Sequence, residues 1–382
     1  MTVFTHRFEV DAAPGASRLA VKCSIDVQGL VSHAGSVALA RTAAPATSDA
    51  TIVRQAREAG AVIVGHTVMP ELGLNTTGIN PVMGTPTNPR DPDRVPGGSS
   101  AGSAVAVASG QADVAYGTDA GGSCRIPPAC CGVVGLKPTQ DRWSMDGVIG
   151  LTYTMDVAGP LARDVAGVLL GTTWMDPSFQ VGDRPARRIG RLRVGDVAPH
   201  IDASVDAALA RHGDVAGVTI IDVDVDDIAC WRDAYNAGGI LLVDEGWRQH
   251  GRLLELHPDG FTPAAADKLR LGGTVDDAKR AWVAATRDRI RSDLDRVLAD
   301  VDALALPTIP IVPPRLDEAG PDHDLVLSRL TIAFNLSGHP SLAMPVPTDG
   351  HAVPASLQLV TGHHDEEHLL ATALAIESSL LA

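Results

Sequence analysis

Two glycine- and serine-rich loops carry the densest set of residues that could do chemistry. The first is PGGSSAGS, from Pro96 to Ser103, and the second is GTDAGGSCR, from Gly117 to Arg125. Glycines at such turns let the backbone approach a ligand closely, and successive N–H groups can converge on an anion or an oxyanion. The spacing alone is equally compatible with two structural glycine turns. Neither loop has the GxxxxGK(S/T) phosphate-binding pattern, so nucleotide binding has weak support.

A lysine interrupts the first apolar run of the chain, LAVKCSI, which starts at Leu19. In a strand such a lysine is commonly an edge residue, or one whose charged end reaches solvent. A buried lysine has another use, because desolvation disfavours the ammonium form and lowers its pKa. The neutral amine of Lys22 could then take a proton from a serine and activate it as a nucleophile.

The same residues lie in contexts that resemble the amidase signature family. Lys22 lies in VKCSIDVQG, Ser99 in PGGSSAGS and Ser123 in GTDAGGSCRIP. Further segments that resemble the family are CGVVGLKPT, AGPLAR, NLSGHP and LQLV. Because several separate motifs follow in order, the resemblance is specific, and it covers essentially the whole chain.

The resemblance implies a Ser-Ser-Lys triad. Ser123 would be the nucleophile, Ser99 the relay serine next to a cis peptide bond, and Lys22 the final base. A free lysine with a pKa of ~10.4 would be only about 0.1% neutral at pH 7.4. Burial and hydrogen bonding to Ser99 must therefore activate Lys22.

The resemblance also implies which residues support this triad. The backbone N–H groups of four consecutive residues would form an oxyanion hole: Ala120, Gly121, Gly122 and Ser123. Three residues would hold the loop without reacting: Thr118, Asp119 and Arg125. Three more lie where the family lines its substrate cleft: Gly73, Leu74 and Thr76.

The implied reaction needs no metal and no organic cofactor. The stretch HHDEEH, from His363 to His368, invites a metal interpretation, but its spacing is not that of HExxH. We expect Asp365 to cap the final helix instead, with Glu366 and Glu367 in its first turn. Cys124, next to the implied nucleophile, is expected to be a small buried residue.

Short β-rich runs alternate with helical runs around these loops. Strands are expected at 19–26, 61–65, 112–117, 192–195 and 303–306. Helices are expected at 49–59, after Ser100, at 275–301 and from about Glu366. Ser48 or Asp49 would cap the first helix, and Gly60 would take the left-handed position after it. The alternation predicts an α/β fold, with a mixed, twisted central β-sheet covered by helices on both faces.

We expect residues 1–382 to form one large domain, which the resemblance makes an amidase signature domain. Its core would span residues 15–175, and a polar linker rich in Pro, Gly and Arg would span about 176–190. The C-terminal part would then be residues 191–382. Only 21 residues precede Lys22, which is short for the family that the chain resembles.

Composition narrows the class of partner. The formal net charge is −15, so the protein as a whole repels the phosphate groups that an extended nucleic-acid surface would have to attract. This charge argues against a nucleic-acid partner. The five cysteines are odd in number and lack CxxC spacing, which favours a reducing cytoplasm. No stretch approaches the ~18 apolar residues of a membrane span, so no membrane partner is expected.

The sequence therefore predicts an amidase that releases ammonia or an amine from a small polar amide or ureide, with 1-carboxybiuret or allophanate as named substrates. Two alternatives remain open. One is an amidase for small aliphatic or aryl amides, and the other is the amidase-like subunit of a tRNA-dependent amidotransferase, against which the acidic balance counts. The presence of Lys22, Ser99 and Ser123 together argues against a non-catalytic relative. A homodimer is also left open.

Overall fold

In the computed structural model, which describes residues 2–9 and 15–382, eleven strands pair into one sheet. The strands are β1 (Phe4–Arg7), β2 (Arg18–Lys22), β3 (Val62–Thr67), β4 (Val114–Asp119), β5 (Val134–Lys137), β6 (Val157–Ala162), β7 (Arg188–Arg193), β8 (Thr219–Asp224), β9 (Ala303–Pro307), β10 (Ser341–Val346) and β11 (Ala355–Val360). Their order across the sheet is β1-β3-β2-β4-β6-β5-β10-β11-β9-β7-β8. The pairs β2–β3, β2–β4, β7–β8 and β7–β9 are parallel and the others antiparallel, so the sheet is mixed as predicted.

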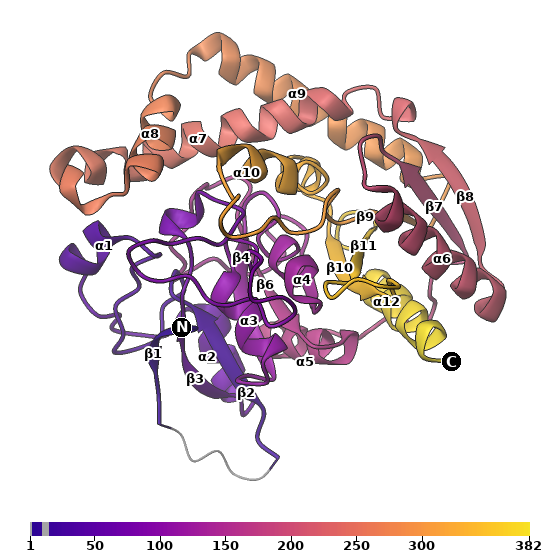
Figure 1. Cartoon of the computed structure of the whole chain (residues 1–382), viewed down its shortest axis with the longest axis horizontal. Helices are drawn as coiled ribbons and strands as arrows, with labels where there is room; N and C mark the ends of the chain where they lie inside the picture. The colour runs from indigo at the N-terminus through magenta and orange to yellow at the C-terminus, as the bar shows by residue number, and fades with distance from the viewer. Residues whose placement is uncertain (1, 10–14) are drawn as a thin grey trace.

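Helices flank this sheet (Figure 1). The α-helices are α1 (Val37–Thr42), α2 (Thr51–Glu58), α3 (Ala101–Ala108), α4 (Ile126–Cys131), α5 (Val165–Met175), α6 (Pro199–Ala216), α7 (Trp231–Leu256), α8 (Pro263–Gly272), α9 (Asp277–Leu298), α10 (Pro321–Ser328), α11 (Ile332–Ser337) and α12 (Glu366–Leu381). Three short 3-10 helices are η1 (Glu71–Gly73), η2 (Val225–Asp227) and η3 (Pro258–Gly260).

Side-chain alternation along β2 shows how both faces of the sheet are covered. Leu19 and Val21 pack in a cluster with residues of α2 and α5, whereas Ala20 packs in a cluster with residues of α3. Because successive side chains of a strand point to opposite faces, Lys22 lies on the same side as Ala20. The strand therefore directs Lys22 toward α3 and the serines that precede it.

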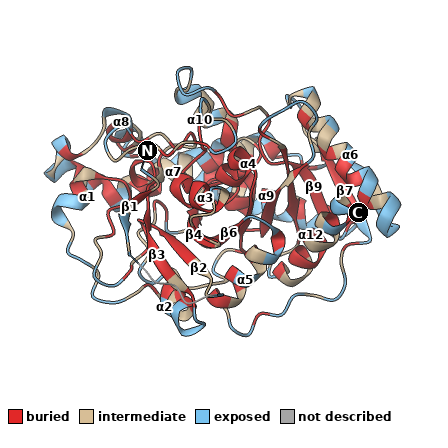
Figure 2. Cartoon of the chain, turned by 60° about the horizontal axis from the view of Figure 1, so that its bottom comes forward, coloured by how far each residue is buried: buried red, intermediate tan, exposed pale blue. Residues whose placement is uncertain are grey.

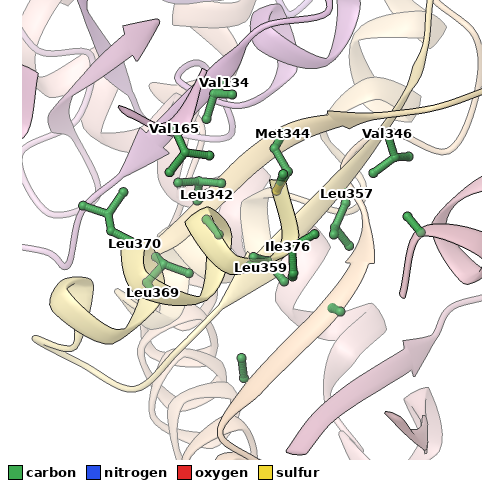
Figure 3. Close-up of a cluster of buried hydrophobic side chains, with 14 of the residues drawn as sticks. Val134, Val165, Leu342, Met344, Val346, Leu357, Leu359, Leu369, Leu370 and Ile376 are labelled. Atoms are coloured by element: carbon green, nitrogen blue, oxygen red, sulfur yellow. The ribbon is translucent and has the colours of Figure 1, made fainter. Parts of the chain in front are cut away.

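The C-terminal half repeats this arrangement on both faces. On one face, Leu342 of β10 and Leu359 of β11 pack against Leu369 and Ile376 of α12 (Figure 3). On the other face, residues of β9 pack against α7, α9 and α11. This second layer includes α11, which lies next to the loop between β4 and α4.

The predicted linker, about 176–190, matches residues 176–187, which form no helix or strand between α5 and β7, but its last three residues belong to β7. Because β7 joins the same sheet beside β9, the segments before and after the linker share one architecture, and the predicted single α/β domain is confirmed. Residues 1 and 10–14 of the predicted domain lie outside the described part.

The predicted cap of α2 is wrong. The N-cap position is Ala50, and no side chain bonds the free N–H groups of that turn. The Asp49 carboxylate instead accepts from the Gln28 N–H at 2.8 Å and from Arg57 Nε at 2.7 Å, so it is already engaged. Gly60 does take a positive φ of 90° just after the helix, as predicted.

Burial is concentrated in the sheet and its flanking segments. Figure 2 shows the central strands in red, with exposed residues on the outer helices and loops. The charged residues Lys22, Arg125 and Lys137 are 0% exposed within this region.

No helix of the described residues has both the length and the apolar character to cross a bilayer.

Candidate active site

Lys22 ends β2 with its amine in a fully buried cluster of oxygen atoms. Lys22 Nζ lies 2.8 Å from Ser99 Oγ, 3.1 Å from Ser100 Oγ, and 2.8 Å and 3.4 Å from the hydroxyl and carbonyl oxygens of Thr118. None of these four partners carries a charge. Burial therefore lowers the pKa of Lys22 from 10.5 to about 8, and more distant acidic groups offset it only in part.

Ser99 and Ser100 lie at the start of α3. The Gly98–Ser99 peptide bond is cis, as the resemblance implied. Ser100 holds the N-cap position of α3 and donates to the Thr118 carbonyl at 3.2 Å. Gly117 makes room for it, because a Cβ at that position would lie 2.6 Å from Ser100 Oγ. Ser100 had no predicted role, although the PGGSS motif contained it.

Ser123 lies on the loop between β4 and α4, with 6% of its surface exposed. Within the described ranges, no residue hydrogen-bonds its hydroxyl, so the structure shows no direct bond from Ser99 to Ser123. The loop follows directly after β4, whose residue Thr118 has its hydroxyl and carbonyl oxygens 2.8 Å and 3.4 Å from Lys22 Nζ. The loop that carries Ser123 thus starts beside the lysine cluster.

Of the four backbone N–H groups predicted to form an oxyanion hole, one is already engaged. The Gly122 N–H is already donated to Asp119 Oδ1 at 2.7 Å, so the prediction for Gly122 does not hold. Gly122 has φ of +137°, and a Cβ there would lie 2.3 Å from Thr331 Oγ1, so only glycine fits. The N–H groups of Ala120, Gly121 and Ser123 have no acceptor within the described part of the chain. These three N–H groups therefore remain available to an acceptor on a ligand.

Asp119 and Arg125 form a fully buried ion pair beneath this loop. Two nitrogens of Arg125 donate to the two oxygens of Asp119 at 3.0 and 3.1 Å. Burial would raise the pKa of Asp119, but the Arg125 charge and a 2.7 Å hydrogen bond from Asn335 outweigh it and lower the pKa to about 2. Arg125 also donates to Gln358 Oε1 at 2.8 Å and to the Thr331 carbonyl at 2.9 Å.

Removing one partner of such a buried pair typically costs about 3–5 kcal/mol. The pair therefore stabilises the loop by tying it to α11 and β11, the elements that carry its other partners. Sequence reasoning assigned no role to Asn335 and Gln358. Their signal was present, because they lie in the NLSGHP and LQLV segments that resemble the family.

The three residues predicted to line a substrate cleft have different surroundings. Gly73 packs against Ser99, because a Cβ at Gly73 would lie 3.1 Å from Ser99 Oγ. Leu74 and Thr76 line a cavity beside α7, α8 and α10. The Thr76 N–H and hydroxyl are both engaged by Asp324, at 2.9 and 3.0 Å, so Thr76 anchors α10.

The final helix is not capped as predicted. Asp365 holds the N-cap position of α12, but its side chain accepts no hydrogen bond from the helix. The buried Glu366 instead accepts from the Thr139 N–H at 2.6 Å and from Arg142 at 3.2 Å.

Cys124 is fully buried, as predicted, and burial raises the pKa of its thiol well above the usual range.

One group within the described residues could hold a metal ion: Asp295, His339 and His363, whose ligand atoms lie within 4.8 Å of one another. His339 Nε2 lies 3.1 Å from Asp295 Oδ1, and the second ring nitrogen of each histidine bonds Ser337. These contacts engage all three side chains without an ion. The group brings together α9, the end of α11 and the segment after β11, and it includes none of the residues around Lys22.

Comparison with known proteins gives consistent matches. A family model described as amidase matches residues 18–180 and 256–370. The chain is 33% identical to 2-amino-5-chloromuconic acid deaminase of Comamonas testosteroni, over 86% of this chain and 74% of that protein. It is also 33% identical to a glutamyl-tRNA(Gln) amidotransferase subunit of Methanospirillum hungatei, over 94% of this chain and 91% of that protein.

One similar solved structure is a chain of an inhibitor-bound protein complex. That complex is called vestigial and is said to reveal the evolutionary origins of an s-triazine catabolic enzyme. The two chains superpose with a TM-score of 0.87 and 27% sequence identity. The match covers 98% of this chain and 90% of that one.

Proposed function

This chain belongs to the amidase family, and we propose that it hydrolyses the C–N bond of a small amide through an acyl-enzyme formed on Ser123. Family membership places the chain among hydrolases of C–N bonds other than peptide bonds. One observation supports the proposed mechanism above the others. The fully buried Lys22 Nζ lies 2.8 Å from Ser99 Oγ, next to the loop that carries Ser123.

In the first half of the reaction, Ser123 Oγ attacks the amide carbonyl carbon. Its proton passes to Ser99 Oγ while the Ser99 proton passes to the neutral Lys22 Nζ. The oxyanion that develops accepts from the N–H groups of Ala120, Gly121 and Ser123. The Ser99–Ser123 hydrogen bond forms when substrate closes the site, since catalytic hydrogen bonds commonly tighten in the bound complex.

In the second half, the protonated Lys22 returns its proton through Ser99 to the leaving nitrogen. The C–N bond breaks and ammonia or an amine departs, leaving an ester on Ser123. Water attacks this ester, its proton follows the same path, and the acid product leaves with Ser123 restored. Every proton is conserved over the cycle, so no cofactor or metal enters it.

The rate should rise with pH through the pKa of Lys22. With a pKa of about 8, about 20% of Lys22 is neutral at pH 7.4, against about 0.1% for a free lysine. Because the neutral amine is the active form, kcat/KM should fall about tenfold per pH unit below pH 8 and level off above about pH 9. The measurement is kcat/KM for a neutral primary amide between pH 6 and 10.

Two controls keep this profile interpretable. Thermal unfolding at each pH establishes that the enzyme stays folded across the range. Lys137 is the other fully buried lysine, and burial lowers its pKa to about 7. Lys137→Met should keep the apparent pKa near 8, whereas a profile that is flat from pH 6 to 9 would contradict Lys22 as the base.

The substrate class predicted from the sequence is a small polar amide or ureide, with 1-carboxybiuret and allophanate as named candidates. An s-triazine ring alternates carbon with nitrogen, so similarity to a chain associated with s-triazine catabolism supports a small nitrogen-rich substrate. An aliphatic or aryl amide is the other candidate within the same chemistry. The polarity of the side chains that line the cavity beside the site helps to distinguish a polar ureide from an aliphatic or aryl amide.

A second candidate function is the amidase-like subunit of a tRNA-dependent amidotransferase. The 33% identity to a subunit of glutamyl-tRNA(Gln) amidotransferase over 94% of this chain favours it. The purified chain alone should nevertheless release ammonia from small amides and ureides without tRNA or partner subunits, measured by a coupled ammonia assay. Ammonia release that appears only with tRNA and partner subunits would replace our proposal with the second candidate.

We further propose that the protein works without nucleic acid or membrane, in a reducing cytoplasm. All five cysteines are free and buried, which supports a reducing compartment. The net charge of −15 supports the absence of a nucleic-acid partner. A homodimer is compatible with this proposal.

A further inference from the structure

A cavity of about 420 Å³ lies beside the proposed active site, among α7, α8 and α10. Leu242 and Ile332 line it, and each has a Cδ1 atom 3.6 Å from the position of a Cβ at Gly121. Leu74, also on the wall, directly follows the glycine that packs on Ser99. The cavity wall therefore packs against a residue that carries a proposed oxyanion donor, which places the cavity within reach of a group bonded to the attacked carbonyl.

The walls of this cavity are mainly aliphatic. Leu271 of α8 and Leu325 of α10 lie on its lining and are 59% and 60% exposed. Among the large exposed apolar side chains of the described residues, only Leu381 is more exposed. Exposed apolar side chains gathered at a concave site are typical of a surface that a ligand covers.

The hydroxyl groups on the lining are already engaged. Each of the four donates to a backbone carbonyl: Thr76 to Asp324 at 3.0 Å, Tyr235 to Leu325 at 2.9 Å, Thr274 to Leu271 at 2.7 Å and Ser328 to Asp324 at 3.0 Å. A ureide presents donors and acceptors along its whole length and needs partners for them when it is buried. These hydroxyls do not have a free proton to donate to one.

The charged groups on the lining are also paired or face water. Lys268 Nζ donates to Asp324 Oδ2 at 2.8 Å and to the Leu74 carbonyl at 2.6 Å. The other oxygen of Asp324 accepts from the Thr76 N–H. Lys279, the second lysine of the lining, is exposed in the first turn of α9. A carboxylate on the substrate would therefore compete with Asp324 for Lys268, or pair with Lys279 where solvent weakens the attraction.

We propose that this cavity binds the apolar acyl group of a neutral amide, aliphatic or aromatic. This inference rests on the proposed function and names its substrate class. A dry cavity of about 150 Å³ already holds benzene, so this larger cavity accommodates an acyl group of about six to ten carbon atoms. The mainly apolar walls favour such a group over ureides and carboxylated amides, whose polar groups would find side-chain partners here only in Asn236, Lys268 and Lys279.

The first experiment measures kcat/KM of the purified wild-type chain for acetamide, butyramide, hexanamide, phenylacetamide, adipic acid monoamide and allophanate. We expect about a fourfold rise per buried methylene from acetamide to hexanamide. Adipic acid monoamide, which matches hexanamide in length but carries a carboxylate, should be at least about tenfold poorer. Preference for allophanate or the monoamide would overturn this inference and leave the proposed function intact. Failure to hydrolyse any of these amides would count against the proposed function itself.

The second experiment fills the cavity. Gly239 of α7 lies on its lining, and a Cβ there would meet no atom within 4 Å. Gly239→Leu should lower the ratio of kcat/KM for hexanamide over acetamide by about tenfold, because the larger acyl group loses its space. Gly195→Leu is the matched control, since Gly195 is equally open and lies outside this cavity. An unchanged ratio in Gly239→Leu, or an equal fall in both variants, would contradict the assignment.

Discussion

Replacing Ser123 with alanine is expected to lower kcat by about 10⁴-fold or more. Without the Ser123 hydroxyl no ester can form, and loss of a nucleophile in a comparable hydrolytic site has this scale of effect. The hydroxyl bonds none of the described residues, so its removal leaves no partner unsatisfied. The free energy of unfolding of the variant should therefore lie within about 0.5 kcal/mol of that of the wild type. Steady-state ammonia release and thermal unfolding of both proteins measure the two effects.

Cys124→Ala is the matched control for this experiment. Cys124 is the next residue in the chain and carries a thiol, but the thiol is fully buried, and burial raises its pKa. We expect this variant to keep turnover within a few-fold of the wild type. Wild-type turnover in Ser123→Ala, or abolished turnover in a folded Cys124→Ala, would refute Ser123 as the nucleophile.

Replacing Lys22 with methionine is expected to lower kcat by about 10³-fold or more. One amine serves as the base in the first half of the reaction and as the acid in the second, so both halves lose their proton carrier. Methionine keeps the unbranched length of the side chain and its packing beneath α3. The Ser99, Ser100 and Thr118 oxygens lose a donor, so a modest fall in thermal stability is also expected.

Lys137→Met separates this effect from the loss of any buried lysine. Both lysines are 0% exposed, and burial lowers the pKa of each. Lys137 Nζ, however, donates to the Pro138 carbonyl rather than to a serine of the site. We expect Lys137→Met to keep kcat within about tenfold of the wild type. Equal losses in both folded variants, or only a few-fold loss in Lys22→Met, would show that Lys22 is not the base.

The residues proposed for chemistry could be predicted because each lies in a short motif that resembles the amidase signature family. Ser99 lies next to the cis peptide bond that starts α3, and Ser123 lies between the end of β4 and the start of α4. Periodicity predicted the helix after Ser100 and the strand before Ser123, whereas the roles of the two serines came from the resemblance. The alternation along β2 also determines that Lys22 points toward α3, which is a local property of five consecutive residues.

The partners that complete the site come from distant segments. Asn335 and Gln358 bond the Asp119–Arg125 pair across more than 200 residues, and no local pattern predicts such contacts. The prediction for Gly122 failed for a different reason, because the acceptor of its N–H is Asp119, only three residues earlier. Whether its N–H is free depends on where the Asp119 carboxylate lies, which only the folded loop determines.

Helix capping shows a similar limit. Asp49 has the residue type and position of a cap, but a 2.7 Å ion pair with Arg57 and the Gln28 N–H engage its carboxylate.

The cavity beside the site is a further case, because α7, α8 and α10 form it together. The composition of any one of these helices does not reveal that the hydroxyl groups on the lining donate to backbone carbonyls.

The most direct test of the proposed mechanism is to trap the acyl-enzyme during turnover. The enzyme is mixed with a slow amide substrate, quenched in acid and digested, and tandem mass spectrometry locates the added mass. We predict an increment equal to the acyl group on Ser123, absent from the Ser123→Ala variant. An adduct on Cys124 or on another residue, or no adduct during a measured burst of ammonia, would contradict acyl transfer to Ser123.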